Sequence, residues 1–91
     1  MWFEWDEQKA ADNERRHGVT FEEAATCFYD PLQVAFYDPD HSEDEDREIL
    51  IAHSDSGTPL LVVYTLRGDA VRIISARRMT RKEIRDYERG I

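Results

Sequence analysis

Apolar and polar residues alternate most regularly in the last third of the chain, where two β-branched runs flank Gly68-Asp69. Glycine can supply the positive φ that a two-residue hairpin turn needs, so this pair predicts a hairpin. With these residues as the loop, the cross-strand pairs begin with Arg67 and Ala70 and continue to Val63 and Ile74. We expect a core face made of Leu60, Val62, Tyr64, Leu66, Val71 and Ile73. We expect the opposite face to carry Leu61, Val63, Thr65, Arg67, Arg72, Ile74, Ala76 and Arg78.

Three guanidiniums and a threonine hydroxyl share this second face, which is otherwise largely apolar. Such a face suits an anion. Phosphate is the obvious candidate, because the planar five-donor fork of arginine can bind it with two hydrogen bonds. Surface strands also carry arginines for solubility or salt bridging, and this alternative stays open.

The N-terminal part of the chain predicts a short strand and two helices. Residues 2–5 alternate, which is typical of a brief edge strand that buries Trp2 or Phe3. Asp6 can cap a helix that runs to about His17 and ends at Gly18. The sequence TFEE from Thr20 is a capping box for a second helix, which continues through Phe28 until Asp30-Pro31 ends it.

Two further strands and a helix complete the predicted order. Residues 32–37 and 47–54 read as strands, and the capping box from Thr80 to Glu83 opens a last helix that ends at Gly90. The fold class is therefore α+β, with a short N-terminal strand, two helices, a four-stranded antiparallel sheet and a C-terminal helix. The 91 residues suffice for one core, so we expect a single domain over 1–91.

The strand 47–54 joins the hairpin through a second turn, for which we take Ser56-Gly57. This register puts Ile49 and Ile51 on the core face, and it also leaves Arg47 and His53 there. It places Glu48 in one row with Thr65 and Arg72. A carboxylate in that row is most simply a salt-bridge partner of the arginine, and otherwise a proton acceptor held by it.

The net charge of −8 is unevenly distributed. Residues 1–55 carry 4 Lys or Arg against 16 Asp or Glu, a balance of −12, and residues 56–91 carry 8 against 4, a balance of +4. This asymmetry suits an anion-binding face on an acidic body that meets a basic partner, and it equally suits a merely soluble protein. The lack of a membrane-spanning run or a leader predicts a cytoplasmic location, and the single cysteine, Cys27, reads as a core residue.

Two polar segments offer candidate chemistry. Residues 38–46 hold six carboxylates and His41, without the glycine-containing spacing of a calcium loop. We expect a solvated loop that contacts a basic segment of a partner. A spacing of four residues places Lys9, Asn13 and His17 on one face of the predicted first helix. This face either lines a site or is a polar stripe exposed to solvent.

Taken in order, these residues resemble the BrnT toxin family, and the resemblance covers nearly the whole chain. It is carried by Phe3-Glu4-Trp5-Asp6, Lys9, Asn13, His17-Gly18-Val19, Phe21-Glu22-Glu23-Ala24, Asp30-Pro31, His41-Ser42, Arg47, Thr65, Arg67 and the run from Arg72 to Arg78.

The resemblance implies a small ribonuclease of the RelE-like fold, acting as the toxin of a bacterial type II toxin–antitoxin pair. Its partners would be RNA as substrate and a BrnA-type antitoxin that neutralises it. Operator DNA would be bound only through the antitoxin, and no membrane would be involved.

No metal cluster is evident in the sequence, so we expect no cofactor and a cleavage by attack of the ribose 2′-hydroxyl on its neighbouring phosphate. This reaction needs a proton acceptor, a proton donor and cations. The catalytic candidates are Arg67, Arg72, Arg77, Arg78, His41 and Lys9, and the RNA-binding candidates are Arg67, Arg72, Arg78 and Thr65. Arg77 has the opposite strand parity from the other arginines.

Two alternatives remain open at this point. The chain is either a catalytically weak or inactive member that binds its antitoxin as a regulatory partner, or an RNA-binding module that does not cleave.

Overall fold

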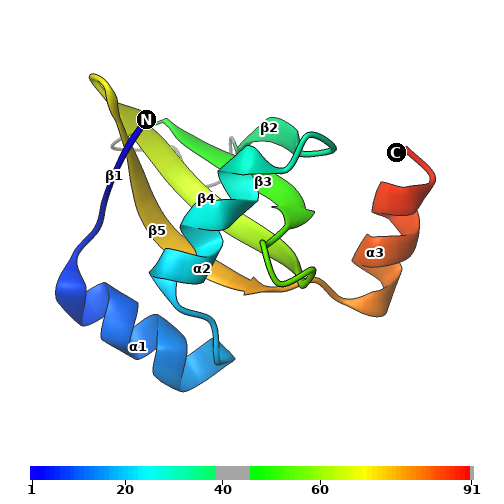
Figure 1. The fold of residues 1–91 in the computed structure, drawn as a ribbon, viewed down its shortest axis with the longest axis horizontal. Helices are drawn as coiled ribbons and strands as arrows, with labels where there is room; N and C mark the ends of the chain where they lie inside the picture. The colour runs from blue at the N-terminus through cyan, green and yellow to red at the C-terminus, as the bar shows by residue number, and fades with distance from the viewer. Residues whose placement is uncertain (39–45, 91) are drawn as a thin grey trace.

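The computed structural model describes residues 1–38 and 46–90. They form one mixed five-stranded sheet with three helices, in the chain order β1, α1, α2, β2, β3, β4, β5, α3 (Figure 1). The strands are β1 (Trp2–Glu4), β2 (Val34–Asp38), β3 (Arg47–His53), β4 (Pro59–Arg67) and β5 (Ala70–Arg78). The helices are α1 (Glu7–His17), α2 (Phe21–Thr26) and α3 (Arg81–Glu88), and a 3-10 turn at Cys27–Tyr29 follows α2. The α+β class is confirmed.

The sheet has the strand order β1-β5-β4-β3-β2, and β1 runs parallel to β5. The predicted four-stranded antiparallel sheet is therefore wrong in this detail. β1 has only three residues, and its partner, residues 70–72 of β5, is distant in the sequence. No turn joins the two strands, so the sequence does not indicate this pairing. Of the two aromatic candidates in β1, Phe3 packs against Phe28 with ring centroids 5.3 Å apart, and Trp2 is 73% exposed.

The pairing of β3 with β4 is offset by one residue from the predicted register. His53 pairs with Pro59, so five residues, 54–58, form the connection instead of the two-residue turn Ser56-Gly57. Because a one-residue slip exchanges the faces of a strand, Leu50 and Ala52 lie in the core and are 1% and 0% exposed.

The same offset moves Arg47, Ile49, Ile51 and His53 to the opposite face, which we call the outer face. Arg47 and His53 are therefore half-buried on the outer face and do not lie in the core. Glu48 pairs with Tyr64 and not with Thr65, so the predicted row of Glu48, Thr65 and Arg72 is wrong.

The central hairpin forms as predicted at its tip. Gly68 has a φ of 58°, and the pairs from Arg67–Ala70 to Tyr64–Ile73 are confirmed. The next pair is Val63 with Ser75, so Ile74 is an extra residue in β5, a β-bulge.

The bulge inverts the parity of β5 beyond Ile73. Ala76 therefore lies in the core, whereas Arg77 pairs with Leu61 on the outer face and Arg78 pairs with Leu60 on the core side. The predicted placement of Ala76 and Arg78 on the outer face is wrong. Strict alternation of faces requires one residue of β5 for each residue of β4, and the bulge adds one residue to β5.

Asn13 of α1 docks the helix against β5 at the bulge. Its side chain is 6% exposed, and Oδ1 accepts a hydrogen bond from the Ala76 amide at 3.0 Å. Nδ2 donates to the carbonyl oxygens of Ala76 at 2.8 Å and Val19 at 3.0 Å. Because β1 covers only residues 70–72, the Asn13 amide takes the place of a neighbouring strand at this edge.

The helix ends follow the predicted capping except in α2, which differs in two ways. Asp6 caps α1 and Gly18 ends it with a φ of 67°, and the capping box of Thr80 is complete. Thr20 accepts from the Glu23 amide, but the Glu23 carboxylate accepts from Ser54 and Ser56 instead of completing the box. The α2 helix also ends at Thr26, where the 3-10 turn begins.

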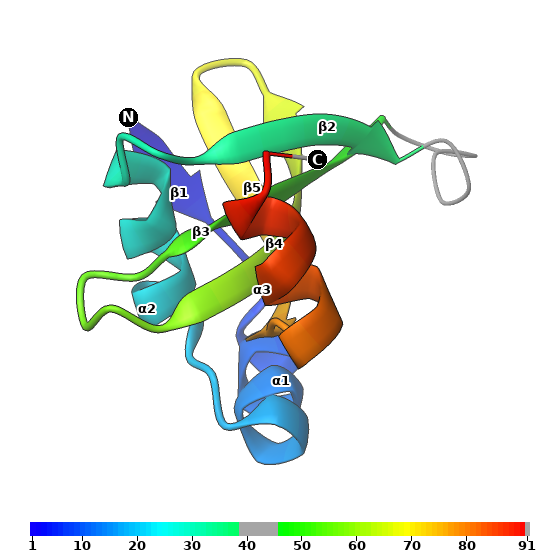
Figure 2. The same cartoon turned by 90° about the vertical axis from the view of Figure 1, so that its right-hand side faces the viewer.

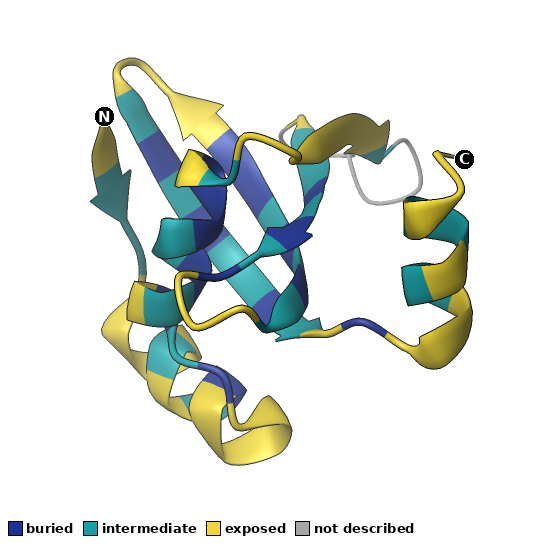
Figure 3. Cartoon of the chain, turned by 45° about the vertical axis from the view of Figure 1, so that its right-hand side comes forward, coloured by how far each residue is buried: buried dark blue, intermediate teal, exposed yellow. Residues whose placement is uncertain are grey.

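Buried residues gather on the middle strands beneath α2 (Figure 3). Cys27 is 0% exposed, which confirms its place in the core, and this burial raises the pKa of its thiol to about 12. The third helix, α3, lies in front of β4 in Figure 2. Its Glu83 contacts Arg77 and its Tyr87 contacts His53, both on the outer face. No helix of residues 1–38 and 46–90 is long and apolar enough to cross a membrane.

Candidate functional site

Arg72 lies on the outer face of β5, as predicted, and it is ion-paired. Its Nη1 donates to Glu4 Oε2 at 2.8 Å, because parallel pairing of β1 with β5 sets these two residues side by side. A carboxylate partner for Arg72 was expected, but it comes from β1 and not from Glu48. The guanidinium keeps other N–H groups for a further acceptor.

Arg77 also lies on the outer face, brought there by the bulge. Its two terminal nitrogens donate to the two carboxylate oxygens of Glu83, both at 2.8 Å. This bidentate pair lowers the pKa of Glu83 to about 2 and raises that of Arg77. Since Glu83 also accepts from the Thr80 amide, the pair fixes the start of α3 to the end of β5.

Arg78 lies apart from Arg72 and Arg77, on the side of β5 that faces α1. Its Nη1 lies close to Gly18, the residue that ends α1. A Cβ atom placed on Gly18 would be 3.7 Å from this nitrogen. A cation is favourable at this place because the carbonyl groups at the end of a helix carry partial negative charge.

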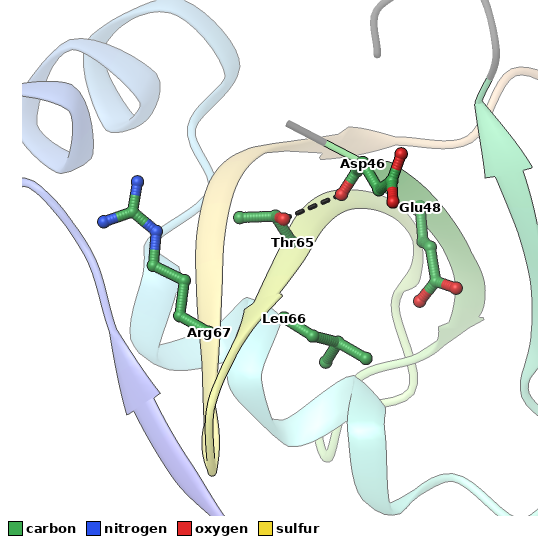
Figure 4. Close-up of a pocket in the computed structure, with 5 residues that line it drawn as sticks. All are labelled: Asp46, Glu48, Thr65, Leu66 and Arg67. Atoms are coloured by element: carbon green, nitrogen blue, oxygen red, sulfur yellow. Dashed lines mark hydrogen bonds between the residues drawn. The ribbon is translucent and has the colours of Figure 1, made fainter. Parts of the chain in front are cut away.

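Thr65 and Arg67 line a hollow of about 400 Å³ near the hairpin tip, together with Leu66 (Figure 4). Thr65 is 3% exposed, and its hydroxyl donates to the carbonyl oxygen of Asp46 at 2.7 Å. The other lining residues are Asp46 and Glu48. Two carboxylates against one guanidinium make this hollow a poor place for a phosphate group.

A second hollow, of about 200 Å³, lies between α1 and the bulge of β5, and we call it the α1–β5 groove. It is lined by Lys9, Asp12, Asn13, Arg16, His17, Ile74 and Ser75. The residues from α1 recur at intervals of three and four, the spacing that brings helix side chains to one face.

The charge of the α1–β5 groove is basic. In the described part of the chain, Lys9, Arg16 and His17 form no ion pair with a carboxylate. Asp12 lines the groove as well, but its carboxylate accepts from Arg15 and Gln8. The groove therefore presents cations whose charge is not already neutralised.

The predicted site residues are thus only partly assembled. Arg72 and Arg77 flank Ser75 along β5, and Lys9 lies across the groove from Ser75. Arg67 and Thr65 are at the hairpin tip, and Arg78 is on the other side of β5. His41 lies outside the described residues.

Sequence reasoning did not single out Asp12, Arg16 or Ser75 of this groove. The spacing of Lys9, Asn13 and His17 was a usable signal, although Asn13 proved to be structural. Ser75 carried no signal, because its orientation depends on the bulge.

His53 is a further titratable residue near the surface, and it has a structural role. Its backbone amide donates to Asp30 Oδ2 at 2.7 Å, and its Nδ1 lies 3.4 Å from the same oxygen. Its ring lies 5.7 Å from that of Tyr87, which donates to the carbonyl of Leu32. The amides of His53 and Leu32 hold the pKa of Asp30 below its usual value.

No group of three or more His, Cys, Asp or Glu side chains in residues 1–38 and 46–90 is arranged to hold a metal ion.

Comparison with known proteins adds a family and a fold. The crystal structure of the Brucella abortus ribonuclease toxin BrnT superposes with a TM-score of 0.66 and 24% sequence identity, over 89% of this chain and 99% of that one. This likeness shows the fold. No curated protein matches the sequence. The family model described as ribonuclease toxin, BrnT, of type II toxin–antitoxin systems matches residues 5–83. Because that match spans most of the sequence, the chain belongs to the BrnT family of ribonuclease toxins.

Proposed function

We propose that this toxin is a metal-independent endoribonuclease that acts on its substrate through β5 and α1. The 2′-hydroxyl of the RNA attacks the adjacent phosphorus, the bond to the 5′-oxygen breaks, and the products carry a 2′,3′-cyclic phosphate and a 5′-hydroxyl. The observation that carries this proposal is the β-bulge at Ile74. It sets Arg77 on the same face as Arg72 and Ser75 beside the basic α1–β5 groove.

Cations are the main requirement of this reaction, because negative charge grows on the phosphate oxygens in the transition state. Arg72 and Arg77 are the closest to the groove along β5. Their carboxylate partners, Glu4 and Glu83, orient the guanidiniums and leave N–H groups that can donate to a phosphate.

The other predicted residues take more distant roles. Arg67 and Thr65 contact the RNA at the hairpin tip away from the reacting phosphate, because Asp46 and Glu48 disfavour a phosphate there. Arg78 contacts the RNA beyond the end of α1. Lys9 binds a phosphate in the groove, and His41 remains a candidate for proton transfer.

The partner of this toxin is a protein antitoxin, as its family implies. We propose that this antitoxin is of the BrnA type and carries the DNA-binding function of the complex. We also propose that the toxin fold is RelE-like and that the toxin acts in the cytoplasm. The excess of carboxylates in residues 1–55 supports a basic segment in the antitoxin.

The decisive experiment uses the purified chain and a labelled single-stranded RNA, with EDTA present and the product ends identified. We expect cleavage in EDTA with cyclic phosphate ends. Arg72→Gln should reduce the rate by about 10²-fold or more, the usual loss when a charged donor to the transition state is removed.

Arg85→Gln is the matched control, because Arg85 is an exposed cation on α3. It should keep the wild-type rate, and both variants should still bind the antitoxin. Intact RNA with wild-type protein would favour a regulatory binding partner. RNA that binds without being cut would favour a binding module.

A further inference from the structure

His17 is the imidazole of the α1–β5 groove, and its position suits proton transfer. It is the last residue of α1, it is exposed, and it lines the hollow together with Ser75. Within residues 1–38 and 46–90, its ring has no hydrogen-bond partner. Both ring nitrogens are therefore available to a bound ligand.

The other described histidine shows the contrast. His53 faces the Asp30 carboxylate through Nδ1 and packs on the ring of Tyr87, so its orientation serves the junction between β3 and α3. In residues 1–38 and 46–90, His17 forms no hydrogen bond, ion pair or ring contact of this kind. An imidazole that is exposed, lines the groove and has no partner among the described residues is placed to contact a bound ligand.

The charged groups around His17 favour a phosphodiester. Lys9 and Arg16 line the same groove, and Arg78 lies beside the adjacent Gly18. Among the lining residues in the described part of the chain, Asp12 carries the only carboxylate, and Arg15 donates to it. The groove therefore attracts anions along its length.

The groove is long enough for a piece of a strand. Lys9 and His17 are eight residues apart, which corresponds to about 12 Å along a helix. Its floor is rigid, because three buried hydrogen bonds of Asn13 tie α1 to β5 and to Val19. Rigid support is what a proton-transfer residue needs to stay in register with its substrate.

We propose that the RNA backbone lies along the α1–β5 groove, held by Lys9 and Arg16, and that His17 accepts the proton of the attacking 2′-hydroxyl. The proposal rests on the endoribonuclease function proposed above. The O2′–P bond forms as the P–O5′ bond breaks, and the 2′-hydroxyl proton passes to the imidazole. The leaving 5′-oxygen takes a proton from water, and the imidazolium returns its proton to the resulting hydroxide.

The test compares His17→Ala with His53→Asn on the full chain, using a labelled single-stranded RNA between pH 5 and 9. His17→Ala should cut at least 10²-fold more slowly, as expected when a general base is lost. Its affinity for RNA should stay within threefold of wild type. Free imidazole in the buffer should restore part of the rate, and the rise of the wild-type rate with pH should be missing.

The control, His53→Asn, should keep the wild-type pH profile and show no response to imidazole. The proton-transfer role is refuted if His17→Ala cuts within threefold of wild type, or if its loss comes without a change in pH profile and without rescue. Circular dichroism and thermal melting confirm that both variants are folded.

A double substitution separates this inference from the proposed function. Lys9→Gln with Arg16→Gln should weaken RNA binding at least tenfold whether or not the chain cleaves. If wild type leaves RNA intact, the endoribonuclease proposal fails and the proton-transfer role of His17 fails with it. Unchanged binding by the double variant in an active enzyme would refute the groove alone.

Discussion

Replacement of Asn13 by alanine should destabilise this protein more than almost any other single truncation on a helix surface. The Asn13 side chain makes three hydrogen bonds, one from the Ala76 amide and two to the carbonyls of Ala76 and Val19. Ala76 and Val19 are both buried, so water cannot replace the lost partners. At about 1 kcal/mol for each bond, the loss is about 3 kcal/mol.

Thermal and urea unfolding measure this loss directly. For a domain of this size, about 3 kcal/mol corresponds to a fall in Tm of roughly 12–24 °C. Gln8→Ala is the matched control, since Gln8 is an exposed amide on the same helix and, among the described residues, its side chain bonds only to Asp12. It should change stability by less than about 0.5 kcal/mol. A loss below about 1 kcal/mol for Asn13→Ala would refute the idea that this amide replaces a strand at the edge of β5.

Three further predictions concern charged and reactive groups. Glu83→Gln should cost about 1 kcal/mol at pH 7, a value reduced for solvent screening of the partly exposed pair with Arg77. Because the pKa of Glu83 is lowered to about 2, this contribution to stability is complete above pH 4.5 and disappears as the pH falls toward 2. Urea unfolding that shows the same stability difference between wild type and Glu83→Gln at pH 7 and at pH 2 would contradict this. Cys27, whose pKa is raised to about 12 by burial, should resist thiol reagents at pH 8 in the native protein and react in urea, and equal labelling rates would disprove its burial. Glu4→Gln removes the ion pair that orients Arg72, so it should slow RNA cleavage several-fold with less than about 1 kcal/mol lost in stability, whereas an unchanged or faster rate would show that Glu4 does not orient the guanidinium.

The local elements could be predicted because their causes are local. The caps at Asp6 and Thr80, the end of α1 at Gly18 and the hairpin at Gly68 each depend on a few adjacent residues. The burial of Cys27 followed from its apolar neighbours. The family resemblance drew on the same residues in order.

The register of β3 could not be predicted, because both faces of that strand are apolar. Ile49 and Ile51 satisfy the alternation rule as well as Leu50 and Ala52 do. The five-residue connection decides between them, and it is held by Glu23 from α2, which is distant in sequence. Hydrophobic patterning specifies a register only where one face is clearly polar.

By itself, then, the sequence determined the helices, the strands, the central turn and the family of this protein, since these depend on residue order and short-range chemistry. Tertiary structure alone decided which arginines share a face. The bulge at Ile74 shifts the parity of β5, so Arg77 joins Arg72 and Arg78 leaves them. Asn13, docking from α1, supplies the hydrogen bonds at that edge, and β1 brings Glu4 to Arg72 from 68 residues away. The candidate site therefore depends on contacts between segments that only the folded chain brings together.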